Sequence, residues 1–222
     1  MGTNRQQHAL LVENYQRYLT DGESGSFVRQ TTQRYTVGTL ERLAEFGSRD
    51  ARRAATLSLG LIADYQSNAT LGKCLSDPDR GVRLLAENGI RDVWCRDGTV
   101  GHRRVLNNII RLNCAGQFET VIHKATQLIE EVPWFAESWN QRAIAYFQVC
   151  EFRDSANDCQ QTLELNPYHY GAAVGMGQCY LELNDGWAAL ECFRRALRLN
   201  PGLEAVRIQV DHLQRALEEP KD

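Results

Sequence analysis

Seven cysteines and five histidines are the residues of this 222-residue chain that could bind a metal or act as nucleophiles. The cysteines include no Cys-x-x-Cys pair, and no two histidines are three or four residues apart, so no helix would present two histidine ligands on one face. Cys114 and His123 are nine residues apart, which favours different helices over a nucleophile and its base. Only a metal site built from distant residues stays open. We therefore expect no catalytic residue, no metal and no cofactor, and mostly buried cysteines.

A cluster of arginines in the first half could bind phosphate groups. Acidic residues interrupt the cluster, and the first 101 residues contain 13 basic and 12 acidic side chains. Because a nucleic-acid surface needs an excess of positive charge, we expect ladders of Arg–Asp pairs here instead, and keep nucleic-acid binding as an alternative. The arginines are Arg49, Arg52, Arg53, Arg80 and Arg83, and the interrupting acids are Asp50, Asp77 and Asp79.

The composition is that of an ordinary globular protein, with 43% hydrophobic residues and a formal net charge of −3. No stretch has the 18 or so uncharged apolar residues of a membrane helix, and residues 1–8 contain no apolar segment of a signal peptide. These features predict a cytoplasmic protein with no membrane partner. Gly175-Met-Gly177 lies within a helical pattern, which favours close helix packing over phosphate or other small-molecule binding.

The second half of the sequence repeats with a period of 34 residues. Pro133, Pro167 and Pro201 are spaced by this interval, and each follows a helical pattern that a proline would end. The alignment of residues 136–169 with 170–203 places small residues opposite one another, and Tyr146 opposite Tyr180. Small residues of this kind allow two helices to approach closely. The small residues are Ala143 with Gly177, and Ser155 with Ala189.

This pattern resembles the tetratricopeptide repeat (TPR) family, whose 34-residue unit is a helix-turn-helix. The unit 136–169 carries Trp139, Ala143, Tyr146, Ser155 and Pro167 in the family's order. The unit 170–203 keeps all of these features but replaces the aromatic residue with Ala173, and the unit 102–135 is degenerate. After them, an amphipathic helix over 204–219 is predicted to cap the array. Its apolar residues are Leu203, Val206, Val210, Leu213 and Leu217.

A different period of 31 residues relates Ala51-Arg-Arg-Ala-Ala55 to Val82-Arg-Leu-Leu-Ala86 in the first half. It predicts two helix pairs, 37–46 with 50–63 and 67–76 with 79–95, in which Asp77 or Asp79 caps the last helix. The segment resembles HEAT repeats of the short bacterial type. Before it, Leu11, Tyr15, Tyr18 and Leu19 mark a capping helix that ends in a flexible stretch, Asp21–Ser26.

Together these patterns predict an all-α protein, a right-handed α-α superhelix or solenoid. Its expected parts are an N-terminal helical cap (1–35), HEAT-like repeats (36–97), three TPR units (98–203) and a C-terminal capping helix (204–219). The stretch Arg96–Gly101 is the predicted junction between the two types of repeat.

The resemblance to TPR proteins implies that the first helix of each unit lines a concave groove. The groove positions hold amide and apolar side chains, which suit an extended peptide. One subset of the family holds a terminal carboxylate with basic residues, but here those positions are Leu106, Ile110, Gln141, Gly171 and Gly175. The predicted partner-binding residues are Asn107, Ile110, Asn113, Asn140, Gln141, Ile144, Phe147, Val174, Gln178 and Leu181.

We therefore predict a non-enzymatic adaptor or scaffold that binds a protein or peptide in this groove, without nucleic acid or small molecules as partners. Two alternatives remain. Short HEAT arrays are similar to those of bilin-attaching lyases, which would make the chain an accessory protein to a pigment-bearing partner. The arginine cluster of the first half would instead support binding to nucleic acid.

Overall fold

The computed structural model describes residues 2–218, with side chains described from residue 10 onward. The described residues form thirteen α-helices and one short 3-10 helix, which confirms the predicted all-α solenoid class. The chain divides into two compact units, with the boundary between Arg96 and Asp97, where the sequence changes from one repeat period to the other. Each unit has its own core.

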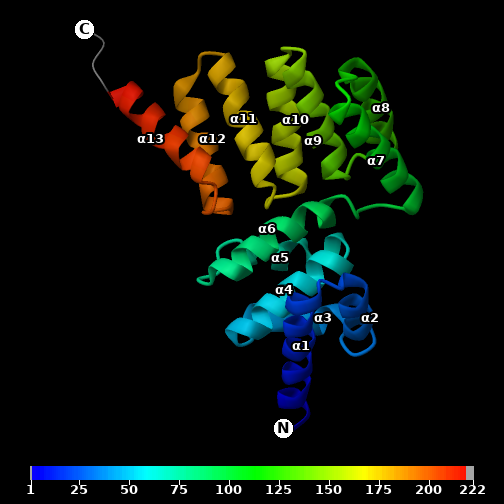
Figure 1. The fold of residues 1–222 in the computed structure, drawn as a ribbon. Helices are drawn as coiled ribbons and strands as arrows, with labels where there is room; N and C mark the ends of the chain where they lie inside the picture. The colour runs from blue at the N-terminus through cyan, green and yellow to red at the C-terminus, as the bar shows by residue number, and fades with distance from the viewer. Residues whose placement is uncertain (1, 219–222) are drawn as a thin grey trace. The chain divides into compact units, whose positions relative to one another are not determined.

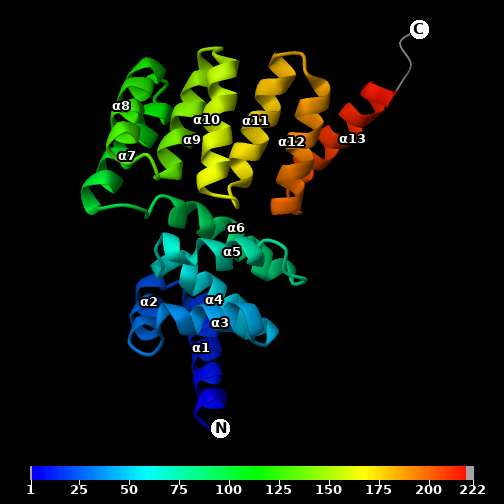
Figure 2. The ribbon, with the colours of Figure 1, turned by 180° about the vertical axis from the view of Figure 1, so that it is seen from behind.

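Helices of the second unit stand side by side in chain order (Figures 1 and 2). Helices α8, α10 and α12 start 34 residues apart, at residues 118, 152 and 186, so the degenerate first repeat has the same register as the others. The bounds are α7 (Val100–Cys114), α8 (Phe118–Glu131), α9 (Ala136–Gln148), α10 (Phe152–Leu165), α11 (Tyr170–Glu182), α12 (Gly186–Leu199) and α13 (Glu204–Glu218).

The turn inside each repeat has one conformation, which places a single residue in the left-handed region. These residues are Gly116, Cys150 and Asn184, with φ angles of 71°, 64° and 59°. In the middle repeat the N–H of Glu151 donates to the carbonyl of Tyr146 at 2.9 Å, which is the bond of a Schellman motif. The same bond joins Gln117 to Leu112 and Asp185 to Tyr180.

Small residues hold the paired helices together, as the sequence predicts. Ala143, Ser155 and Ala189 are buried, and the Ser155 hydroxyl donates to the Ala143 carbonyl at 2.8 Å. A Cβ atom on Gly177 would lie 2.6 Å from the ring of Phe193, so a side chain here has no room. The Gly-x-Gly segment therefore serves helix packing.

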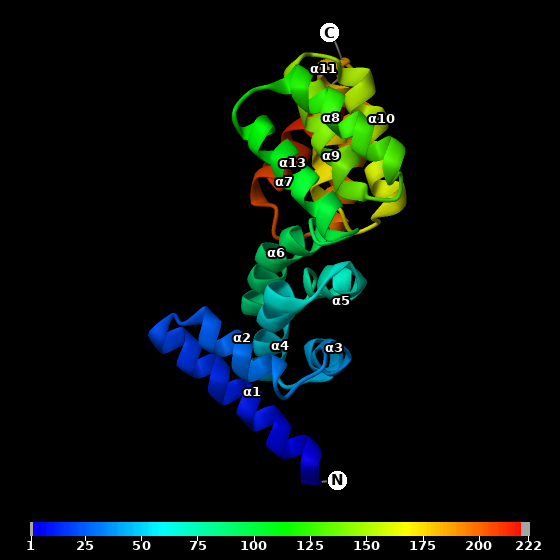
Figure 3. The ribbon, with the colours of Figure 1, turned by 90° about the vertical axis from the view of Figure 1, so that its right-hand side faces the viewer.

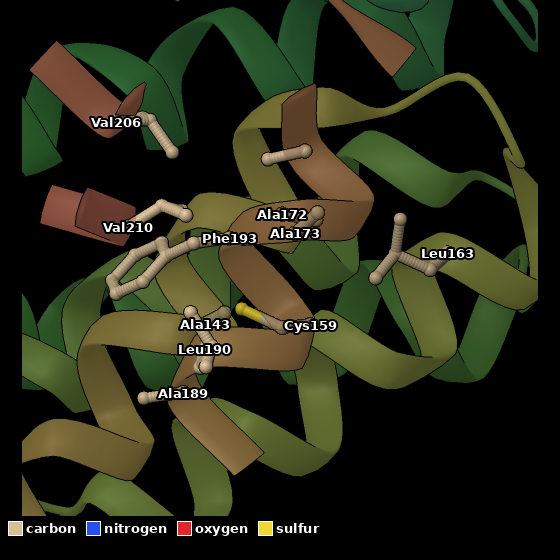
Figure 4. Close-up of a cluster of buried hydrophobic side chains, with 11 residues drawn as sticks. Ala143, Cys159, Leu163, Ala172, Ala173, Ala189, Leu190, Phe193, Val206 and Val210 are labelled. Atoms are coloured by element: carbon tan, nitrogen blue, oxygen red, sulfur yellow. The ribbon is translucent and has the colours of Figure 1, made fainter. Parts of the chain in front are cut away.

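The last helix closes the second unit. Val206 and Val210 of α13 are buried and join a cluster built around Phe193, with the ring and the two valines drawn close together in Figure 4. Leu213 and Leu217 pack against the same cluster, so the predicted apolar face of this helix is confirmed.

The first unit is built around α4 (Arg49–Ile62). The hairpin of α1 (Gly2–Asp21) and α2 (Ser24–Thr32) packs against α4, and α3 (Val37–Phe46) lies on its other side (Figure 3). Two helix pairs follow closely the predicted bounds: α3 with α4, and α5 (Asn68–Cys74) with α6 (Arg80–Trp94), preceded by the 3-10 helix η1 (Tyr65–Ser67). Their assignment as HEAT-like repeats remains a prediction.

Glycines set the contact between α4 and α6. A Cβ atom on Gly60 would lie 2.7 Å from the Cα atom of Gly89, and one on Gly89 would lie 2.6 Å from the Cα atom of Gly60. The two backbones therefore meet directly at this crossing. Asp79 caps α6 by accepting a hydrogen bond from the N–H of Val82 at 3.0 Å, as expected.

The predicted flexible stretch Asp21–Ser26 is wrong, because α2 begins at Ser24. Gly22, with a φ of 72°, ends α1 and turns the chain directly into this helix. Phe27 of α2 is buried, and its ring centroid lies 5.5 Å from that of Tyr18. Leu19, expected on the apolar face of α1, is instead 57% exposed.

Candidate functional site

The first helices of the three repeats of the second unit form one layer, in which α9 contacts α7 on one side and α11 on the other. The second helices pack against this layer, since α9 contacts both α8 and α10, and α11 contacts both α10 and α12. The ten predicted binding residues all belong to α7, α9 and α11. We call the surface that they form the first-helix face.

Most of the ten residues are accessible. Ile144 and Leu181 are large apolar side chains that are 41% and 38% exposed. Gln141 is the exception, because it is 9% exposed and its amide is engaged by neighbouring residues. Asn107 and Gln178 are also exposed, and those partly buried are Ile110, Asn113, Asn140, Phe147 and Val174.

A buried carboxylate lies within this layer. Glu137, in the first turn of α9, is 5% exposed and accepts hydrogen bonds from Asn140 Nδ2 at 2.9 Å and Gln141 Nε2 at 2.7 Å. Its other oxygen lies 3.0 Å from Nε2 of His169, the residue that caps the next first helix, α11. Glu137 therefore ties the starts of two successive first helices together.

The hydrogen bonds define the tautomer of His169. Its Nδ1 atom accepts a bond from the N–H of Ala172 at 2.9 Å, so this nitrogen carries no proton. The proton of the neutral ring is then on Nε2, which donates to Glu137. Burial acts to raise the pKa of Glu137, but the hydrogen bond and the electrostatic interaction with His169, together with the hydrogen bonds from Gln141 and Asn140, outweigh it and hold this pKa below its ordinary value. Glu137 is therefore ionised.

The network continues to α7. Asn113 Nδ2 donates to the side-chain oxygen of Gln141 at 2.8 Å and to its main-chain carbonyl at 2.9 Å. Three of the predicted residues, Asn113, Asn140 and Gln141, are thereby brought together around a glutamate that was not predicted. A signal for it exists in the repeat alignment. His169 occupies the position of the buried Phe135 one repeat earlier, and Glu137 the position of Gly171 one repeat later.

A second polar cluster joins the two helices of the middle repeat to the second helix of the repeat before it. The guanidinium of Arg142 pairs with both oxygens of Asp158 on α10, at 2.7 and 2.9 Å, and donates to Thr126 on α8 at 2.8 Å. The rings of Trp139 and Tyr146 flank it, at 5.0 and 5.7 Å. One arginine thus joins three helices beneath the layer that carries the face.

Two of the five arginines of the first-unit cluster form the predicted Arg–Asp ladder, whereas Arg80 is exposed and Arg49 pairs with its neighbour Asp50, at 3.5 Å. Arg52 makes a bidentate pair with Asp77, at 2.8 and 3.0 Å, and Arg53 makes one with Asp79, at 2.7 and 2.8 Å. Arg83 donates to the main-chain carbonyl of Asp77 at 2.7 Å. These guanidinium groups are engaged within the protein, which favours the structural interpretation over phosphate binding.

The cysteines are less uniformly buried than expected. Cys74, Cys159 and Cys179 are buried, and burial raises the pKa of each of these thiols. Cys95 and Cys192 are partly buried, and Cys114 and Cys150 are exposed, so the expectation that most of the seven are buried is wrong. No group of three or more potential metal ligands occurs within the part of the chain that the structure describes. None of the described helices is long and apolar enough to span a membrane.

Comparison with known proteins identifies relatives that match part of the chain. A TPR repeat-containing protein of Rhizobium etli is 32% identical over 145 residues, which cover 64% of this chain and 68% of that protein. Human DnaJ homolog subfamily C member 7 is 31% identical over 75 residues, which cover 34% of this chain and 15% of that protein. No protein-family model matches the chain.

Among solved structures, the first TPR of Spaghetti (RPAP3), bound to the HSP90 peptide SRMEEVD, is similar in fold. The TM-score is 0.51 at 20% sequence identity, and the match covers 53% of this chain and 94% of that one. At this identity the likeness concerns the fold alone.

Proposed function

The chain belongs to the tetratricopeptide repeat family, and from this premise we propose that it is a non-enzymatic adaptor that binds a segment of a partner protein. The binding surface is the first-helix face of the second unit. Repeat arrays of this type bury their core between neighbouring helices and leave one long face for recognition.

The observation that supports this surface is the combination of exposed apolar and amide side chains on consecutive first helices. Ile144 and Leu181 expose large apolar side chains, and Asn107 and Gln178 are exposed amides. An extended peptide needs both features, because its backbone requires hydrogen bonds and its apolar side chains require contact. We assign Gln141, which is buried, to the support of the face and not to contact with the peptide.

The first TPR of Spaghetti (RPAP3), which is similar in fold, is bound to the HSP90 peptide SRMEEVD. The positions at which some members of the family carry basic residues for a terminal carboxylate are here uncharged, as Leu106, Ile110, Gln141, Gly171 and Gly175. We therefore propose that this face binds its partner without gripping a terminal carboxylate.

The test compares partners captured from a cell lysate by the wild-type chain and by the double variant Ile144→Ser/Leu181→Ser. Both side chains are more than one-third exposed, so the variant should retain its fold, which circular dichroism would verify. The matched control is Leu84→Ser on α6, which changes a leucine of the first unit that is 49% exposed. The proposal predicts that the main partner is lost only from the double variant. An unchanged set of partners would refute the assignment of the face.

A further inference from the structure

The hydrogen bonds around Glu137 determine which polar atoms are left for a partner. An ionised carboxylate only accepts hydrogen bonds, so the amide groups of Asn140 and Gln141 must turn their NH₂ ends towards it. The oxygen of Gln141 then faces Asn113, which must also turn its NH₂ end inward. One buried charge thereby orients three amide side chains on two helices.

The amide atoms that this network of hydrogen bonds does not use are hydrogen-bond acceptors. The oxygen of Asn113 is buried and has no hydrogen-bond partner within the described residues. The oxygen of Asn140 is the end of that amide that Glu137 does not use. A buried acceptor without a partner destabilises the free protein, so this end of the network has no donor to spare for another acceptor.

The charge of this region also favours a ligand that donates hydrogen bonds and carries a positive charge. Glu137 carries a negative charge, and its neighbour His169 is the neutral tautomer because Nδ1 accepts the bond from Ala172. The nearby guanidinium of Arg142 is paired with Asp158. Hydrogen bonds and the positive end of the α9 helix dipole therefore stabilise the buried charge of Glu137. This negative charge attracts a cation that approaches the face.

We propose that Glu137 is a specificity-determining residue, which selects a partner segment bearing a lysine or arginine side chain at the first-helix face. The ammonium or guanidinium group donates to the oxygen of Asn140. Glu137 acts through the amides that it orients and does not itself contact the partner. This inference rests on the proposed function of the face.

The test uses fluorescein-labelled ten-residue peptide pools with amidated C-termini, whose central residue is fixed as Arg, Glu or Ala among randomised uncharged neighbours. Fluorescence anisotropy measures the affinity of the full chain for each pool. We expect the Arg pool to bind at least about tenfold more tightly than the Glu pool. In Glu137→Gln, which can turn its own NH₂ towards Asn140 and Gln141, we expect this preference to fall below about threefold.

Two variants accompany Glu137→Gln. Glu119→Gln removes the same charge from an exposed position of α8 and should leave the preference unchanged. Asn140→Ala removes one acceptor while Glu137 remains, and should also reduce the preference for the Arg pool. It provides the test if thermal unfolding shows that Glu137→Gln does not fold.

The outcomes separate the two proposals. If no pool binds the wild-type chain, the proposed peptide-binding function fails. If the pools bind with equal affinity, or if a folded Glu137→Gln keeps the full preference, only the role of Glu137 is overturned. The Glu pool could instead bind more tightly than the Arg pool, and the double variant Arg104→Gln/Arg111→Gln could abolish this difference. That result would assign recognition to the exposed arginines of α7 and would overturn the role of Glu137.

Discussion

At the scale of single residues, the turn residue Cys150 is in an unfavourable backbone conformation. Its φ of 64° is in the left-handed region, where the equivalent positions hold Gly116 and Asn184, the residue types that adopt it most readily. The side chain is exposed, so no packing would be lost on its removal. The turn is therefore a place where the sequence is not optimal for stability.

We predict that Cys150→Gly stabilises the second unit by about 0.5–1 kcal/mol, because glycine adopts this conformation without a steric penalty. Urea unfolding followed by tryptophan fluorescence measures the change, since Trp134, Trp139 and Trp187 belong to this unit. The matched variant Gly116→Ala should destabilise the unit. A lower unfolding midpoint for Cys150→Gly would contradict the role of the turn.

The Arg53–Asp79 pair predicts a dependence of stability on pH. The Arg53 guanidinium holds the pKa of Asp79 at about 2, below its usual value of 3.8. A lowered folded-state pKa stabilises the protein above about pH 4, and this contribution is lost as the pH falls through about 2. The pair should contribute about 1–2 kcal/mol to the first unit at neutral pH.

The variant Asp79→Asn isolates this charge, because asparagine also caps a helix. Urea midpoints of wild type and variant, followed by circular dichroism between pH 5 and pH 2, should converge as the pH falls. A constant difference between the two across this range would show that the ion pair does not stabilise the fold.

The polar core at Glu137 shows why parts of the site could not be predicted from the sequence. Glu137 and His169 are 32 residues apart, and neither fits an apolar pattern. Exposed residues such as Ile144 and Gln178 could be placed from the repeat register alone. The burial of Gln141 depends on a hydrogen-bond partner that the register does not reveal.

At the scale of secondary-structure elements, the repeat period predicted the helices better than composition did. The prolines at 34-residue intervals located the helix pairs of the second unit, including the degenerate first pair. Helix α2 was missed because Gly22, Gly25 and two serines indicate a loop. Its burial rests on Phe27 and Thr31, too few residues to form a visible period.

The glycine contact between α4 and α6 makes a prediction at this scale. Gly60→Ala should destabilise the first unit by about 1–3 kcal/mol, because the new Cβ atom would overlap the backbone of Gly89. The control Gly38→Ala has nothing within 4 Å of its Cβ and should stabilise α3 by up to about 1 kcal/mol. Urea unfolding monitored by circular dichroism measures the change in stability of each variant. Equal effects of the two variants would contradict the close contact between Gly60 and Gly89.

At the scale of the whole molecule, the near-neutral charge of the chain agrees with recognition by local chemistry. The net charge is −3, and Arg52 and Arg53 of the arginine cluster are paired with aspartates. A long-range field for a polyanion is therefore absent. We propose that recognition instead depends on a few side chains on the first-helix face.

The most direct test of the account is the affinity of the purified partner for variants of this face, measured by isothermal titration calorimetry. We predict that Ile144→Ser/Leu181→Ser weakens binding at least about tenfold, since two apolar contacts of about 1 kcal/mol each are lost. Ile208→Ser, which changes an exposed isoleucine of α13, should alter the affinity less than about twofold. Equal affinities for the wild type and a folded double variant would contradict the claim that this face binds the partner.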